Sequence, residues 1–396
     1  MSSPRAVVVV AILATSAASA AGPAAPHELW IWAESTSSPA PALLPGDRLT
    51  DREAELQAHC GKSEAGLRAV AKRVLERKVR GASFLDVDGL STAQRASGEP
   101  HVWPRAWSVS GRALDHAATL EKLDAWRAGF RDLGERRCGV ATGVAADGTQ
   151  IAVAVSVDAL ADLSPLPLRT HAGTWLTVDA RLLVAASMAH VVVVGPSGTP
   201  RNVPTSFEGG RVRARFAPDR PGAFTVQIVA DVSTGPRPVI EASVFADIEP
   251  PQEPISSAAP GELAGAGAPD GASGLTRMID ALRAESELPA VGRDPRLDAL
   301  AAAHARRMLG THTVGHDVGD GDPAQRVQNA GMSVRATGEN VAHAPSVALA
   351  HRSLYASPSH RSNLLHPSFD HVGIGVAEDP DGSVWVVELF VTSHGS

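Results

Sequence analysis

Hydrophobic positions in the last third of the chain recur at helical spacing. The apolar residues from 275 to 282 follow the i, i+3, i+4, i+7 pattern, which predicts a helix over 275–285. A second helix is predicted to begin at Asp294-Pro295, because Asp favours the N-cap and Pro the first turn. Residues 372–376 then alternate as in a strand, and a second strand over 384–391 follows an Asp-Gly turn. The pattern predicts helices followed by a closing β-hairpin.

The first half of the chain shows two other patterns. Helical spacing over 49–76 and 114–130 precedes an apolar strand over 151–157, which predicts an N-terminal α/β domain spanning 49–165. From 166 to 248, short runs rich in Val and Phe are separated by Gly/Pro turns, as in a small β-sandwich domain. No catalytic motif occurs in that stretch, so we interpret it as a spacer or adhesion-like module.

Three further segments have the composition of signals and connections. Residues 1–20 combine Arg5, an apolar stretch and a small-residue cleavage site, as in a signal peptide. Residues 21–48 are predicted to be a disordered lead-in, and the Pro/Ala/Gly-rich stretch 249–273 a linker. The last domain then spans 274–396. No segment is long enough to cross a bilayer, so we expect a protein that is secreted or periplasmic.

Composition narrows the class of protein. The chain has 396 residues, of which 44% are hydrophobic and 20% charged, as in folded globular proteins of several domains. Its formal net charge is −7 and it contains no Lys/Arg run, which argues against a nucleic-acid partner.

Only two cysteines are present, Cys60 and Cys138. In an exported protein an even count favours a disulfide, which would contribute on the order of 4 kcal/mol for a loop of this length. Two buried free thiols are the alternative. Neither cysteine belongs to a CxxC motif, which argues against redox catalysis.

Several ordered motifs in the last domain point to one family. The string 338–342 reads Gly-Glu-Asn-Val-Ala, and 357–365 reads Ser-Pro-Ser-His-Arg-Ser-Asn-Leu-Leu. Together with 369–376 and 385–390 they resemble the CAP superfamily (SCP-like), which includes cysteine-rich secretory, pathogenesis-related and bacterial secreted proteins. The resemblance implies an α-β-α sandwich and covers about 120 residues, all after the linker.

The resemblance also implies a cleft. By position its residues are His316, Glu339 and His360. Many members of the family have a second Glu, three residues beyond a Trp; this chain has Ser357 at that position and Leu354 in place of the Trp. The set of four polar groups is therefore incomplete.

The residues of the cleft allow three interpretations. Two imidazoles and a carboxylate are a ligand set for a divalent metal such as zinc, with His316 and His360 as ligands. The same groups could carry out acid–base work. The third interpretation is a hydrogen-bonded polar cluster that only fixes the fold. We expect His304 to pack in the core, and His351 to be a surface residue or a neighbour of the cleft.

A short pattern in the N-terminal domain echoes the last domain. Residues 138–157 resemble 372–391, with a Gly-rich strand, an Asp-Gly turn and a second strand. We state as a hypothesis that the N-terminal α/β domain is a degenerate CAP-like domain without the histidines.

Three functions of the protein are compatible with these observations. The first is a non-enzymatic exported binding protein whose cleft takes a small apolar ligand, a divalent metal or a cell-envelope partner. The second is a metal-dependent hydrolase with His316 and His360 as ligands and Glu339 as base. The third is a structural or adhesion module.

Overall fold

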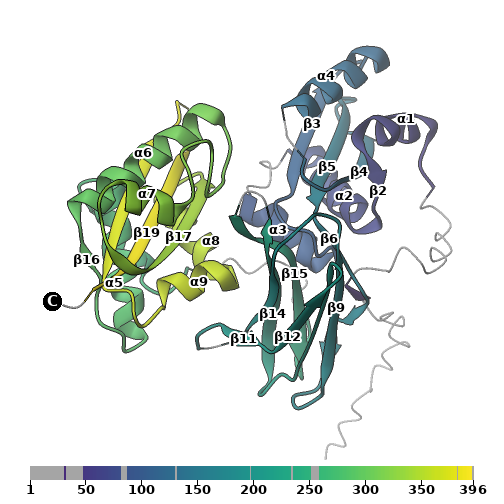
Figure 1. The fold of residues 1–396 in the computed structure, drawn as a ribbon. Helices are drawn as coiled ribbons and strands as arrows, with labels where there is room; N and C mark the ends of the chain where they lie inside the picture. Colours follow the sequence, from purple (N-terminus) through teal and green to yellow (C-terminus); the bar gives the residue numbers. More distant parts are fainter. Residues whose placement is uncertain are drawn as a thin grey trace, which may run out of the picture.

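A computed structural model describes residues 31–32, 48–81, 87–129, 132–196, 198–232, 235–250, 258–380 and 382–394. Within these ranges the chain forms an N-terminal α/β unit, a central unit of two sheets and a C-terminal α/β unit (Figure 1). The predicted signal peptide lies outside the described residues, as does the predicted lead-in except for its short strand β1 (Ile31–Trp32), which pairs with β7 (Leu166–Pro167), and Arg48.

In the N-terminal unit, helices cover both faces of a four-stranded sheet of order β2-β4-β5-β3. Its elements are α1 (Asp51–Cys60), β2 (Lys62–Ser63), α2 (Ala65–Val79), α3 (Val87–Ala96), β3 (Arg105–Gly111), α4 (His116–Ala128), β4 (Glu135–Val144) and β5 (Gln150–Ala159). The single helix predicted over 49–76 is wrong. It is divided at Gly61, whose φ of 149° suits a residue without a β-carbon, and Thr50 caps α1 in a capping box with Glu53.

The predicted disulfide is confirmed. Cys60, the last residue of α1, is bonded to Cys138 in β4, and their Cα atoms are 5.9 Å apart. The bond ties the first helix to the sheet across 78 residues of sequence. Both half-cystines are buried among the apolar side chains between the sheet and helices α1 and α4.

The central unit encloses one apolar core between a five-stranded sheet, β11-β10-β14-β15-β8, and a four-stranded sheet, β12-β13-β9-β6. Its strands are β6 (Ala161–Leu163), β8 (Arg169–Thr170), β9 (Leu176–Leu182), β10 (Ala189–Val194), β11 (Arg201–Val203), β12 (Thr205–Glu208), β13 (Arg211–Phe216), β14 (Gly222–Val232) and β15 (Gly235–Ala246). Buried and exposed positions alternate along β9 and β13, because only one face of that sheet meets the core.

The C-terminal unit is an α-β-α sandwich around the sheet β16-β18-β19-β17. Its elements are η1 (Glu262–Gly265), α5 (Gly271–Glu285), β16 (Gly292–Arg293), α6 (Pro295–Thr311), α7 (Pro323–Asn329), β17 (Val334–Ala344), α8 (Val347–Ala356), α9 (Pro358–Leu364), β18 (His371–Glu378) and β19 (Val384–Ser393). Helices α6 and α7 cover one face of the sheet, and α5, α8 and α9 the other. Asp294 caps α6 with Pro295 in its first turn, as predicted.

Much of the stretch predicted as a linker, 249–273, is structured. Residues 251–257 lie outside the described residues, but from residue 258 the chain packs on the C-terminal unit. Glu262 forms an ion pair with Arg352 of α8, and Nε2 of His351 lies 3.0 Å from the carbonyl oxygen of Pro260. His351 is fully buried, which excludes the surface position, one of the two alternatives given for it. Asp270 caps α5, which begins at Gly271.

The two α/β units have the same strand order and directions. β2 runs parallel to β4 as β16 does to β18, and the other pairs are antiparallel in both units. Gly139 and Gly373 are equivalent, because a β-carbon on either would lie about 2 Å from the backbone of Leu67 or Leu297.

The register also shows which residues of the N-terminal unit stand at the positions of Glu339 and His304. Gly373 pairs with Leu389, which pairs with Glu339; in the N-terminal unit Gly139 pairs with Val155, which pairs with Ala106. Ala106 therefore stands at the position of Glu339. Seven residues beyond the equivalent leucines, Val74 stands at the position of His304.

Candidate functional site

His316 lies in the loop between α6 and α7, and the loop is held by its own acidic residues. Oδ1 of Asp317 accepts the backbone N–H groups of Gly319 at 2.8 Å and Gly321 at 3.1 Å, and these bonds lower the pKa of the carboxyl. Asp322 caps α7 by accepting the N–H of Gln325. These acids therefore act on the loop's own backbone.

Glu339, on β17, joins His316 to Arg326 of α7. Its Oε1 lies 2.9 Å from Nδ1 of His316, and its Oε2 accepts a hydrogen bond from Arg326. Arg326 also donates to the carbonyl oxygens of His316, at 2.7 Å, and Gly321, at 2.6 Å. A carboxylate can only accept, so this arrangement places a ring proton of His316 on Nδ1; in the neutral imidazole Nε2 then keeps its lone pair.

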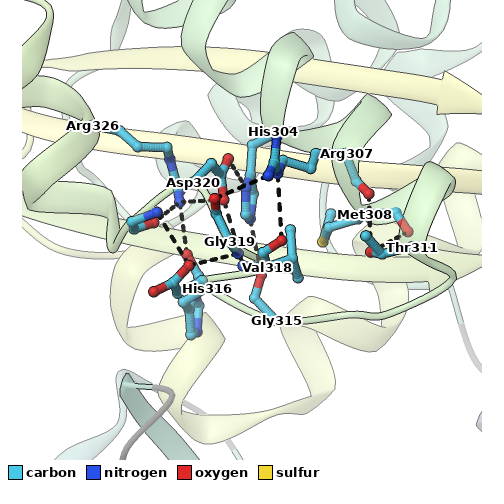
Figure 2. A network of polar contacts seen from close by, with 12 residues as sticks. His304, Arg307, Met308, Thr311, Gly315, His316, Val318, Gly319, Asp320 and Arg326 are labelled. Carbon is cyan, nitrogen blue, oxygen red and sulfur yellow. Dashed lines mark hydrogen bonds and ion pairs between the residues drawn. The ribbon is translucent and has the colours of Figure 1, made fainter.

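His304 belongs to the same network, which the sequence analysis missed. It is fully buried, as expected for the core face of α6. Both ring nitrogens are nevertheless engaged: Nδ1 lies 2.8 Å from Oδ2 of Asp320, and Nε2 lies 2.9 Å from the carbonyl oxygen of Gly315 (Figure 2). His304 thus anchors the loop that carries His316. The acid-rich segment 316–322, which follows α6, was the only signal for it in the sequence.

His360 lies in the first turn of α9. Although the residue keeps some exposed surface, the pKa of its ring falls to about 3. Removal of the ring from water is the main cause, and the nearby His316 is the second. The lowered pKa favours the neutral imidazole of His360 at physiological pH.

Two asparagines of the family-like motifs attach α9 to the sheet. Asn340 donates to the carbonyl oxygen of His360 at 3.2 Å and to Oε2 of Glu388 at 2.9 Å. Asn363 donates to Oδ1 of Asn340 at 2.9 Å and to the carbonyl oxygen of Glu339 at 3.1 Å. Glu388 is fully buried, and burial raises its pKa to about 7.

The two substituted positions, Leu354 and Ser357, serve other parts of the fold. Leu354 is buried in the core beside α5 and the sheet. The Oγ atom of Ser357 instead accepts a hydrogen bond from Gln227 of the central unit at 3.1 Å.

The donor set fits a loosely held metal ion better than a tightly held one. Zinc sites in proteins have three or four protein ligands. Across the described ranges, no group of three or more His, Cys, Asp or Glu side chains could hold a metal ion. Two imidazoles remain, with His316 oriented by a carboxylate, as is usual for histidine ligands of metals. Water would have to supply the other ligands.

No helix in the described part of the chain is long and apolar enough to cross a membrane.

Comparison with known proteins shows which family the C-terminal unit resembles. The model of the CAP family, the cysteine-rich secretory protein family, matches residues 276–390. The uncharacterized protein YkwD of Bacillus subtilis (strain 168) is 27% identical over 119 residues, which are 29% of this chain. The aligned part spans 45% of YkwD, less than half of that relative.

Two solved structures of bacterial surface or extracellular proteins also resemble parts of this chain. An outer surface protein of Borrelia burgdorferi is 24% identical with a TM-score of 0.29, over 30% of this chain and 90% of that one. An extracellular SCP-domain protein of Bacillus anthracis is 13% identical with a TM-score of 0.30, over 59% of this chain and 86% of that one. The motifs, the α-β-α sandwich and the family match agree, and residues 276–390 are a bacterial CAP-like domain.

Proposed function

We propose that this chain is an exported binding protein and that its CAP domain weakly binds a divalent cation such as Zn²⁺ through the imidazoles of His316 and His360. The observation that carries the proposal is the contact between Glu339 and Nδ1 of His316. It fixes the tautomer in which Nε2 is a free donor atom for a metal.

The protonation state of His360 also supports the binding of a metal ion. Metal ions bind the neutral imidazole, and protons compete with them for it. With a pKa of about 3, His360 needs no deprotonation before it can bind a cation at neutral pH. Two protein ligands with water in the remaining positions correspond to weak, reversible binding.

Hydrolysis is supported less well. In that alternative Glu339 would act as general base and would need an oxygen free to take a proton from water. Both of its oxygens already accept hydrogen bonds, one from His316 and one from the buried guanidinium of Arg326. The carboxylate therefore orients the site and does not face a substrate.

The N-terminal unit is, in this proposal, a degenerate CAP-like domain that contributes structure only. Its strand order, strand directions and tightly packed Gly139 parallel those of the CAP domain. Ala106 and Val74 occupy the positions of Glu339 and His304, so the network that orients a histidine has no counterpart there.

Export is supported by the signal-like residues 1–20 and by the Cys60–Cys138 bond, since disulfides persist mainly in oxidising compartments.

Isothermal titration calorimetry with Zn²⁺ tests the proposed function. The wild-type protein should bind one ion with a weak affinity, and the His316→Ala, His360→Ala double variant should lose that binding while keeping its circular dichroism spectrum. His312→Asn is the matched control: it removes an exposed imidazole from the same loop, and Asn tolerates the φ of 47° found there. Binding that survives in the double variant, or is absent from the wild type, would overturn the proposal.

A further inference from the structure

The helix that carries His360 begins without a cap of its own. Ser357 occupies the N-cap position of α9, but its side chain makes no capping hydrogen bond. The first N–H groups of a helix have no partner within the helix and need one from elsewhere. Here the backbone N–H of Ser359 donates to Oε1 of Gln227, at 2.9 Å.

Gln227 belongs to β14, in the central unit. Its side chain is fully buried, and its Nε2 donates to Oγ of Ser357 at 3.1 Å. The amide thus contacts the residues on both sides of Pro358. Figure 1 shows α8 and α9 on the side of the C-terminal unit that faces the central unit, and α9 contacts both β14 and β10.

The N-terminal unit in turn holds Gln227 in place, through Glu241. Nε2 of Gln227 also donates to Oε2 of Glu241 at 2.9 Å, and Glu241 is the direct partner of Gln227 in the pairing of β14 with β15. The other oxygen of Glu241 is ion-paired with Arg95 of α3, and its backbone N–H donates to the carbonyl oxygen of Pro100 at 2.8 Å. A continuous polar chain therefore runs from the N-terminal unit to the first turn of α9.

The same hairpin also approaches the other histidine. A β-carbon on Gly235, the first residue of β15, would lie 3.9 Å from Cβ of His316. The strands β14 and β15 thus lie beside Ser359, the neighbour of His360, and beside His316. The central unit is consequently in contact with the loop that carries His316 and with the first turn of α9 that carries His360.

We propose that Gln227 is a positioning residue for the CAP-domain site: it caps α9 from the central domain and so fixes His360 relative to His316. This inference rests on the proposed cation site for its affinity readout and extends it, because it makes the central domain part of the site's construction. Gln227 does not touch the ion and acts only through the first turn of α9.

The test uses the full chain with Gln227→Met, which keeps the size of the side chain and removes its hydrogen bonds. Zn²⁺ affinity should fall about five-fold, the change expected for loss of a helix cap worth about 1 kcal/mol. Hydrogen exchange at the Ser359 amide should become faster. Gln227→Asn, whose amide is too short to reach Ser359, should act in the same direction and retains a polar group if the Met variant fails to fold.

Gln57→Met is the matched control. Gln57 is also buried and donates to the carbonyl oxygens of Gly61 and Cys138, but it lies in the N-terminal unit, away from α9. This variant should leave Zn²⁺ affinity and Ser359 exchange unchanged. A merely structural loss of stability would affect both glutamine variants alike.

Unchanged affinity and exchange in Gln227→Met, or an equal effect of Gln57→Met, would overturn the inference. If the wild type binds no Zn²⁺, the proposed cation site fails, whereas Ser359 exchange still decides whether Gln227 caps α9.

Discussion

Arg326 holds His316 twice: its Nη1 donates to the carbonyl oxygen of His316 at 2.7 Å, and its Nη2 binds the carboxylate that accepts from the imidazole of the same residue. Main chain and side chain of His316 are thus fixed by one buried guanidinium. The contact explains how a histidine in a loop has a defined orientation.

Glu339→Gln should weaken Zn²⁺ binding by roughly 10- to 100-fold, the usual effect of removing a residue that orients a histidine ligand. The amide keeps the shape of the side chain but has only one acceptor oxygen, so it cannot serve both His316 and Arg326. Calorimetry measures the affinity, with the exposed Glu378→Gln as control. Equal affinities in Glu339→Gln and wild type would show that the carboxylate does not orient the site.

Glu388 should make the CAP domain less stable as the pH rises. In the folded protein the pKa of this carboxyl is about 7, whereas its ordinary value is 4.5. The folded state therefore binds more protons than the unfolded state between these values, and its stability falls as pH increases through this window. The loss is on the order of 3 kcal/mol.

Hydrogen exchange of the β17 and β19 amides at pH values across that window measures the effect for this domain. The difference in opening free energy between wild type and Glu388→Gln should change across the window. His360 acts in the opposite direction, since its lowered pKa favours the folded state above about pH 6.5 and less as pH falls toward 3. Because both proteins retain His360, its contribution cancels in the difference. A difference independent of pH would contradict the prediction.

A C-terminal fragment that begins at residue 258 should be more stable than one that begins at residue 275. The longer fragment keeps the Glu262–Arg352 ion pair, the partner of the buried His351 and the Asp270 cap of α5. Loss of one helix cap costs about 1 kcal/mol, and a buried polar group left without a partner about 1–3 kcal/mol. Thermal unfolding of the two fragments measures the difference; Glu262→Gln in the longer fragment should reproduce part of it. Equal melting temperatures would show that this segment adds no stability.

The sequence determined the local structure of the CAP domain well, because helix starts there depend on residues adjacent in the chain. Asp294-Pro295 and Asp322-Pro323 begin helices, and the motifs at 338–342 and 357–365 lie within the family match. The same reasoning failed at Gly61, where a backbone conformation reserved for glycine divides two helices of similar pattern.

Tertiary structure alone decided what each polar side chain faces. His304 has the spacing of a core residue, and only folding brings Asp320 and Gly315 to its two nitrogens. Gln227 is one polar residue in an apolar strand, and nothing near it in sequence indicates that Ser359, 132 residues away, is its partner. Periodicity encodes which face of an element is buried, but hydrogen-bond partners come from other elements, so they are set only when those elements pack.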